Sequence, residues 1–347
     1  MTTSTIEGES FFQLDNYYYN EQINKIVEPI LLQFDKIVRS YAIFNLFFLT
    51  IGFIESIFLI IFFAMLAKSS ILALSLAFVF LTFFSYFILR IYFQTKKPEQ
   101  FKEIKSRYLD GCKSFLNYKE GMPEHHVVLA NACSKLANML HQREYSIYRL
   151  PKWLDIFAPT LEKFSCWWHW NDIHHMQEML LLHAIEEHIK LVKCEPTNLE
   201  VHAALANAYV MLSGLYVDPR TIEGFSDDRW FPADKFTEAL DQKFRLTAER
   251  AIEEFKILND YAPNDPWVHS QLAYSYHDLQ MPEEEIQEYE TILKLCPGDK
   301  DVLVKLGKLY FQQGQNAQGL RIYEELKKCN YKKAENLINF YGAYAPF

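Results

Sequence analysis

Glycine and proline are scarce in this sequence, with 11 glycines and 13 prolines among 347 residues. Phosphate-binding loops depend on glycine, so a P-loop or dinucleotide-binding site is not expected. Both residues interrupt helices, and their scarcity leaves long stretches that a helix can occupy. Half of the residues are apolar and 16% are aromatic, which is enough to form a sizeable core. The composition therefore predicts an all-helical, folded protein.

The sequence also lacks the short motifs of several enzyme classes. It contains no Gly-x-Ser-x-Gly elbow, no His-Glu-x-x-His pair and no Cys-x-x-Cys pair. The cysteines are far apart, so we expect reduced thiols, with Cys194 and Cys296 packed near helix ends. We therefore predict that the chain is not an enzyme and that it carries no cofactor. The six cysteines are Cys112, Cys133, Cys166, Cys194, Cys296 and Cys329.

Histidines and glutamates gather between residues 169 and 188. On a helix, ligands converge only at spacings of three, four or seven, and a metal site needs three or four of them. His175 and Glu178 have such a spacing, as do His183 and Glu187, but an apolar run separates the two pairs. We therefore expect no metal site, and a solvated or packed helix instead.

Positive charge is in the minority, with 35 Lys and Arg against 44 Asp and Glu, for a formal net charge of -9. Nucleic-acid binding draws most of its affinity from clustered basic side chains, and no basic stripe is present. The charge balance therefore argues against a nucleic-acid partner.

Two long apolar runs lie near the N-terminus, from Tyr41 to Ala67 and from Ile71 to Phe93. Each exceeds the roughly 20 residues that a helix needs to cross a hydrocarbon core of about 30 Å. A cleaved signal peptide is a poor alternative, because the apolar stretch starts late and is too long. A soluble hairpin would have to bury Phe and Ile on every helical face. The runs therefore predict a transmembrane helical hairpin over 41–93, with the lipid bilayer as partner.

Basic residues flank this hairpin mainly on one side, and the turn between its helices holds only Lys68. The positive-inside rule then places both termini and the C-terminal domain in the cytoplasm. The two lobes also resemble the bilobed segment of chlamydial inclusion-membrane proteins, in which case this cytoplasm is the host's. The flanking residues are Lys36, Arg39, Arg90, Lys96, Lys97, Lys102, Lys105 and Arg107.

Glu55 is an acidic residue near the middle of the apolar block. An ionisable group at this depth needs a partner. If the hairpin turns at Lys68, the antiparallel helices bring Glu55 level with Thr82 and Ser85, whose hydroxyls can bond a carboxyl group. A contact between two copies, giving a homo-oligomer, and a proton or ion pathway are the alternatives.

Apolar residues recur every three or four positions in the segment before the hairpin, which predicts an amphipathic helix within residues 1–40. This helix either lies on the membrane surface or packs on the soluble domain. The stripe consists of Ile23, Ile26, Val27, Ile30, Leu31, Phe34, Ile37, Val38 and Tyr41.

The C-terminal half contains an internal repeat. Similar helical segments begin at Ala184, Ala251, Glu285 and Gly319, at offsets of 67, 34 and 34 residues. The last three are each preceded by a helix with a large residue, a small residue and an aromatic residue at fixed spacing. These triplets are Leu205, Ala206 and Tyr209, then Leu272, Ala273 and Tyr276, then Leu306, Gly307 and Tyr310.

This pattern resembles the tetratricopeptide repeat (TPR) family, whose units are pairs of stacked helices. The resemblance covers roughly residues 174–340 of a predicted repeat domain at 174–347, and it implies an α-solenoid of TPR-like helix pairs with two insertions. His202 and His269 stand where the family has Trp or Leu. Residues 98–173 are a helical linker or degenerate repeat, in which Leu129, Ala130 and Cys133 match the triplet. Its aromatic insertion, with Trp153, Trp167, Trp168 and Trp170, makes a satellite core or lies near the membrane surface.

The resemblance also implies a concave groove, lined by residues of each first helix that the core does not use. We expect a protein-interaction scaffold that binds a peptide or partner helix there, unless the chain's own C-terminal tail or long insertion fills the groove. An assembly or quality-control factor for an envelope complex, or a small transport subunit acting through Glu55, is the alternative. The groove residues are Asn207, Met211, Trp267, Gln271, Tyr274, His277, Asp278, Lys305, Lys308 and Phe311.

Overall fold

The computed structural model describes residues 4–66, 71–119, 121–148, 156–221, 230–329, 331–332 and 334–342, with the side chains of 4–18, 20 and 64–66 set aside. Every regular element in these ranges is a helix, which confirms the predicted all-α class. The chain forms two compact units: Met1–Glu187 with Ser226–Lys235, and His188–Phe225 with Phe236–Phe347. The first is called unit 1 and the second unit 2.

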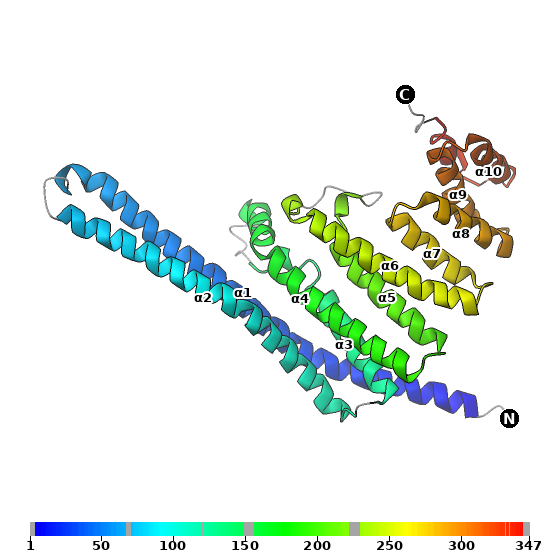
Figure 1. The fold of residues 1–347 in the computed structure, drawn as a ribbon, viewed down its shortest axis with the longest axis horizontal. Helices are drawn as coiled ribbons and strands as arrows, with labels where there is room; N and C mark the ends of the chain where they lie inside the picture. The colour runs from blue at the N-terminus through cyan, green and yellow to red at the C-terminus, as the bar shows by residue number, and fades with distance from the viewer. Residues whose placement is uncertain are drawn as a thin grey trace. The chain divides into compact units, whose positions relative to one another are not determined.

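Unit 1 is built around two long helices, α1 and α2, which run side by side in opposite directions (Figure 1). Each continues beyond the predicted hairpin, α1 passing through Pro29 and α2 through Pro98. The helices of unit 1 are α1 (Ser4–Leu66), α2 (Ile71–Leu116), α3 (Pro123–Leu140), η1 (Arg143–Tyr145), the part of α4 (Ala158–Cys194) up to Glu187, and η4 (Ala233–Lys235).

The apolar stripe of α1 packs inside unit 1. Phe34 and Val38 are 1% and 0% exposed, and the rings of Phe34 and Phe101 of α2 lie 5.2 Å apart. Asp35 accepts two hydrogen bonds from Arg143, at 2.9 Å from Nε and 2.8 Å from Nη2, which ties α1 to η1. Of the two interpretations of the stripe, the structure therefore shows the packed one.

The apolar part of the hairpin, which includes Ile60 of α1 and Phe80 of α2, has an exposed surface. Ile60 and Phe80 are 77% and 74% exposed, and the most apolar 18-residue stretches of α1 and α2 have no buried residue. Both helices are long and apolar enough to cross a membrane. The core helix of a soluble protein would be buried instead, because its apolar side chains gain free energy by leaving water.

From α5 onward, the α-helices of unit 2 follow one another, and each contacts the next α-helix along the chain (Figure 1). The α-helix that follows the long insertion, α6, begins at Glu238 and is longer than its counterparts α8 and α10. The helices are α5 (Leu199–Tyr216), η3 (Pro219–Thr221), α6 (Glu238–Tyr261), α7 (Pro266–Asp278), α8 (Pro282–Leu295), α9 (Lys300–Gln312), α10 (Asn316–Lys328) and α11 (Ala334–Ile338).

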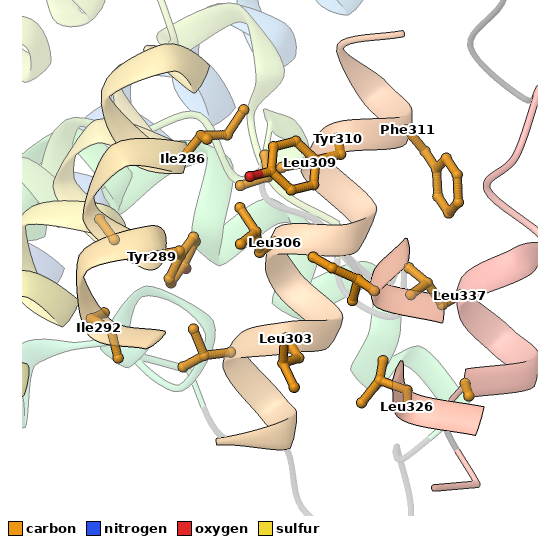
Figure 2. Packing of buried hydrophobic residues seen from close by; sticks show 14 residues of the cluster. Ile286, Tyr289, Ile292, Leu303, Leu306, Leu309, Tyr310, Phe311, Leu326 and Leu337 are labelled. Carbon is orange, nitrogen blue, oxygen red and sulfur yellow. The ribbon is translucent and has the colours of Figure 1, made fainter. Parts of the chain in front are cut away.

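Side chains from α8, α9, α10 and α11, together with Ala273 of α7, form one buried cluster, with the inward faces of α8 and α9 meeting at Tyr289 and Leu306 (Figure 2). Two glycines allow close packing around it. A Cβ atom on Gly307 would lie 2.8 Å from Leu337 Cδ2, and one on Gly319 would lie 2.5 Å from Phe311 Cε1. Small residues at these positions are therefore a packing requirement.

A histidine–glutamate contact recurs in three helix pairs. His126 of α3 meets Glu187 of α4 within unit 1, with 2.6 Å between Nδ1 and Oε2. Within unit 2, His202 meets Glu254 at 2.7 Å and His269 meets Glu288 at 2.6 Å, again through Nδ1 and Oε2. Each histidine lies three residues before the Leu-Ala step of its helix. The α3–α4 pair therefore shares this link with two pairs of unit 2.

Candidate functional site

The candidate site is the exposed face of α7 in unit 2. Asp265 caps this helix, its side chain accepting a hydrogen bond from the Trp267 N–H at 2.9 Å, and Pro266 occupies the first helical position. The cap fixes where the helix begins, so the spacing of the following residues decides which share a face. Trp267, Gln271 and Tyr274 are four and three residues apart and lie on one face.

Two large aromatic side chains are exposed on this face. Trp267 is 43% exposed and Tyr274 is 45% exposed. The Trp267 ring is backed by the buried Phe255 of α6, with ring centroids 6.2 Å apart in an edge-on arrangement. Gln271 is half-buried between them, and Asp278 is exposed one turn beyond Tyr274. Aromatic residues presented in this way are typical of protein-binding surfaces.

Lys305 connects α7 with α9. Its Nζ donates a hydrogen bond to Tyr274 Oη at 2.9 Å and lies 4.5 Å from the Tyr274 ring centroid. The same ammonium group lies 5.9 Å from the ring of Tyr289 on α8. Lys305 is therefore held beside two aromatic rings while remaining exposed, so its position is set before any partner arrives.

His277 belongs to the same helix but has a partner inside the unit. Its Nδ1 lies 3.1 Å from Oε2 of Glu285, a side chain that is only 4% exposed. His277 therefore joins the end of α7 to α8, and the predicted role in binding is not needed to explain its position.

The C-terminal residues cover part of the predicted groove. Phe311 is 2% exposed, and its ring lies 5.8 Å from that of Tyr341. The expectation that Phe311 lines an open groove is therefore corrected: the residues after α11 and the tight contact with Gly319 bury it. Lys308 Nζ lies 5.0 Å from the Phe340 ring, so this residue too meets the chain's own C-terminal segment. Residues 343–347 of the predicted tail lie outside the described ranges.

Asn207 and Met211 lie four residues apart on α5, the first exposed and the second half-buried. The repeat register predicts them in the same way as the α7 residues, so nothing in the sequence distinguishes the two sets. In the described part of unit 2, no hydrogen bond or ring contact joins them to Trp267, Tyr274 or Lys305. The structure therefore brings together the α7 and α9 residues and leaves the α5 residues apart.

Polar groups inside the hairpin bond one another. Thr82 Oγ1 donates to Glu55 Oε1 at 2.8 Å, across the two antiparallel helices. Closer to Tyr41, where the first apolar run begins, Tyr86 donates to Asn45 Oδ1 at 2.9 Å. Both hydrogen bonds link α1 to α2 within apolar surroundings, where a polar group needs such a partner.

Three of the cysteines are exposed. Cys112, Cys133 and Cys166 are buried, whereas Cys194, Cys296 and Cys329 are exposed. The expectation that Cys194 and Cys296 pack near helix ends is therefore corrected, because the last turns of α4 and α8 turn these side chains to solvent. Among the described residues, no three His, Cys, Asp or Glu side chains are grouped as metal ligands would be.

Comparison of the sequence with protein-family models and with curated proteins finds no match. The functional argument therefore rests on the α7–α9 surface of unit 2 and on the hairpin of unit 1.

Proposed function

We propose that this chain is a membrane-anchored scaffold that binds a peptide segment or helix of a partner protein on the α7–α9 surface. The observation that carries the proposal is the combination of Trp267 and Tyr274, both more than 40% exposed, with Lys305 held against Tyr274. Exposed aromatics backed by a core lose little side-chain entropy on binding and so favour recognition.

The anchor part of the proposal is supported by the exposed apolar surface of the hairpin. Side chains such as Ile60 and Phe80 would be costly to leave in water, and the bilayer is a solvent in which they are stable. The basic residues on one side of the hairpin favour a two-pass topology with both termini in the cytoplasm.

The scaffold part is supported by the repeat. The sequence offsets of 34 residues coincide with the α7–α8 and α9–α10 helix pairs, as expected for tetratricopeptide-type units stacked in an array. In such an array the first helices of successive pairs provide one binding face, and Tyr274 of α7 and Lys305 of α9 belong to this set.

The side chains also indicate the kind of segment bound. Lys305 can pair with a carboxylate of the partner, Gln271 can bond its backbone, and Trp267 with Tyr274 can contact an apolar or aromatic side chain. We therefore expect a segment in which an acidic residue lies close to an apolar one.

A photoreactive amino acid placed at Trp267 in the full-length, membrane-bound protein tests this function. The expected result is a specific adduct with a protein in the native membrane, and its severalfold loss when Tyr274→Ala and Lys305→Ala are added. Leu246 is a matched control, because it is an apolar residue that is 65% exposed on α6. Equal adducts from both positions, or none from Trp267, would show that α7 is not the binding surface.

A further inference from the structure

An apolar cleft of about 750 Å³ lies within unit 1, between the hairpin and the start of α4. Its walls come from α1, from α2 and from the first turns of α4, together with Tyr148. Representative lining residues are Ala42, Leu49, Phe53, Phe83, Leu161 and Phe164. The sequence alone does not indicate this cleft, because Leu161 of its α4 wall comes 75 residues after Tyr86 of its α2 wall.

The cleft lies along the part of the hairpin that is predicted to cross the membrane. Its α1 wall extends from Ala42 to Ser56, a rise of about 21 Å at about 1.5 Å per residue. One leaflet of a bilayer has about half of the roughly 30 Å hydrocarbon thickness. If the hairpin spans the bilayer, the cleft is longer than the roughly 15 Å hydrocarbon thickness of one leaflet, and the start of α4 lies at membrane depth.

The start of α4 and the two residues before it have a surface that fits this depth. Ile156 and Phe157 are 88% and 58% exposed, and Phe164 and Trp167 are 46% and 50% exposed. Of the two interpretations of the tryptophan-rich insertion, exposure of this kind favours a position at the membrane interface, where Trp and Phe are stable. Trp153 lies outside the described residues.

We infer that the cleft holds an acyl chain of a membrane phospholipid, with the start of α4 inserted in the bilayer interface beside the hairpin. This inference rests on the proposed membrane anchor. A lipid is the expected occupant because the walls are almost entirely apolar and continue into the exposed apolar surface of α1 and α2. Such walls offer few hydrogen-bonding groups with which a partner protein could be specified.

Among the polar lining residues, Asn45 and Tyr86 lie toward the Ala42 end of the cleft, where a lipid headgroup would lie. Ser56 and Thr82 lie farther along the hairpin and bond within it, to the Gly52 carbonyl and to Glu55. Asn45 and Tyr86 line the cleft and bond each other, and Arg90 Nη1 donates to Tyr86 Oη at 3.3 Å. Arg90 is exposed, and its hydrogen bond to Tyr86 holds its guanidinium group next to a residue that lines the cleft. It is therefore placed to meet the phosphate of the lipid whose chain fills the cleft.

The test reconstitutes the full-length protein in vesicles of phosphatidylcholine that carries a photoactivatable diazirine on one acyl chain, and maps the labelled residues. The expected result is labelling of 161–168 together with the α1 wall. Gly52→Leu should reduce the labelling of 161–168 severalfold, because Gly52 lines the cleft and a Cβ atom there meets no atom within 4 Å. Ala77→Leu, on an exposed part of α2, is the matched control and should leave it unchanged.

Two other outcomes separate failure of this inference from failure of the membrane anchor. Labelling of exposed hairpin residues such as Phe80 without labelling of 161–168 would keep the anchor and overturn the lipid site. Absence of label throughout 41–93 would overturn the membrane anchor as well.

Discussion

His269 bonds through both ring nitrogens: Nδ1 lies 2.6 Å from Glu288 Oε2, and Nε2 lies 3.0 Å from the carbonyl oxygen of Pro263. His202, 67 residues earlier, repeats both contacts at 2.7 and 3.0 Å with Glu254 and the corresponding proline carbonyl. Carboxylate and carbonyl oxygens only accept hydrogen bonds, so a histidine donates to both when both nitrogens carry a proton. For His202, whose pKa is raised by these hydrogen bonds, the relationship makes the pairing of α5 and α6 dependent on protonation.

The first prediction concerns pH. Burial lowers the pKa of His202, but the hydrogen bonds to Glu254 and to the Pro196 carbonyl outweigh it and raise this pKa above 6.5. A raised pKa in the folded state contributes stability at low pH, which is lost as the pH rises through that value. Thermal unfolding of the intact protein in detergent should therefore show a loss on the order of 1 kcal/mol between about pH 6 and about pH 9.

His202→Phe is the matched variant for this experiment, because it keeps a ring and removes both donors. Its stability should lack the component that falls with rising pH in the wild type. An identical pH dependence in both proteins would contradict the assignment to His202.

A second prediction replaces the His269–Glu288 contact with the apolar residues found at the matching positions of the α9–α10 pair. Leu303 and Ile322 stand 34 residues after His269 and Glu288, and both are buried in the cluster of Figure 2. Glu288→Ala alone should destabilise the protein by about 1–3 kcal/mol, because it leaves a buried histidine without its acceptor. The double variant with His269→Leu and Glu288→Ile should recover most of this loss, as measured by thermal unfolding. A double variant less stable than Glu288→Ala would contradict it.

A third prediction compares two helical glycines. Gly319→Ala would place a Cβ atom 2.5 Å from the ring of Phe311, which is itself buried, so we expect destabilisation by about 1–3 kcal/mol. Gly214→Ala, in α5, meets no atom within 4 Å and should be neutral or stabilising by up to about 1 kcal/mol. Urea unfolding measures the free energy of unfolding of the two variants. Equal changes would mean that the Phe311 ring moves aside at no cost in stability.

A fourth prediction concerns the hairpin. Thr82→Val removes the hydroxyl that donates to Glu55, and should lower stability in detergent by about 0.6–1.7 kcal/mol. Glu55→Gln keeps an acceptor oxygen and should unfold nearly as the wild type does. Thr50→Val is the control, because Thr50 bonds only the carbonyl of Leu46 in its own helix. A larger effect of Glu55→Gln than of Thr82→Val would favour a role for the charge, as in transport.

A fifth prediction uses the thiols. Burial raises the pKa of Cys112 to about 11 and that of Cys166 to about 12, so both should resist maleimide in the folded protein. Cys194, Cys296 and Cys329 are exposed and should react. With a membrane-impermeant maleimide, labelling only after lysis is expected if unit 2 is cytoplasmic. Labelling of intact cells would reverse the proposed topology.

Much of the helical organisation follows from the sequence because periodicity and hydropathy are local properties. The 34-residue offsets predict where α7 to α10 recur, and the antiparallel register of the hairpin predicts that Glu55 and Thr82 are level. The Trp267 and Tyr274 positions follow from the same register. Their exposure could be expected because the repeat pattern assigns the core to other residues of α7.

Tertiary structure alone decided which apolar faces are covered. The stripe around Phe34 could equally have met a membrane, and it is buried because α2 and η1 supply partners more than 60 residues away. Phe311 is buried rather than exposed because Tyr341 returns to it from beyond α11. The sequence by itself determined the helices and their apolar faces. The choice between solvent, lipid and protein at each face depended on residues far apart along the chain, since burial is a property of the assembled fold and not of a helical period.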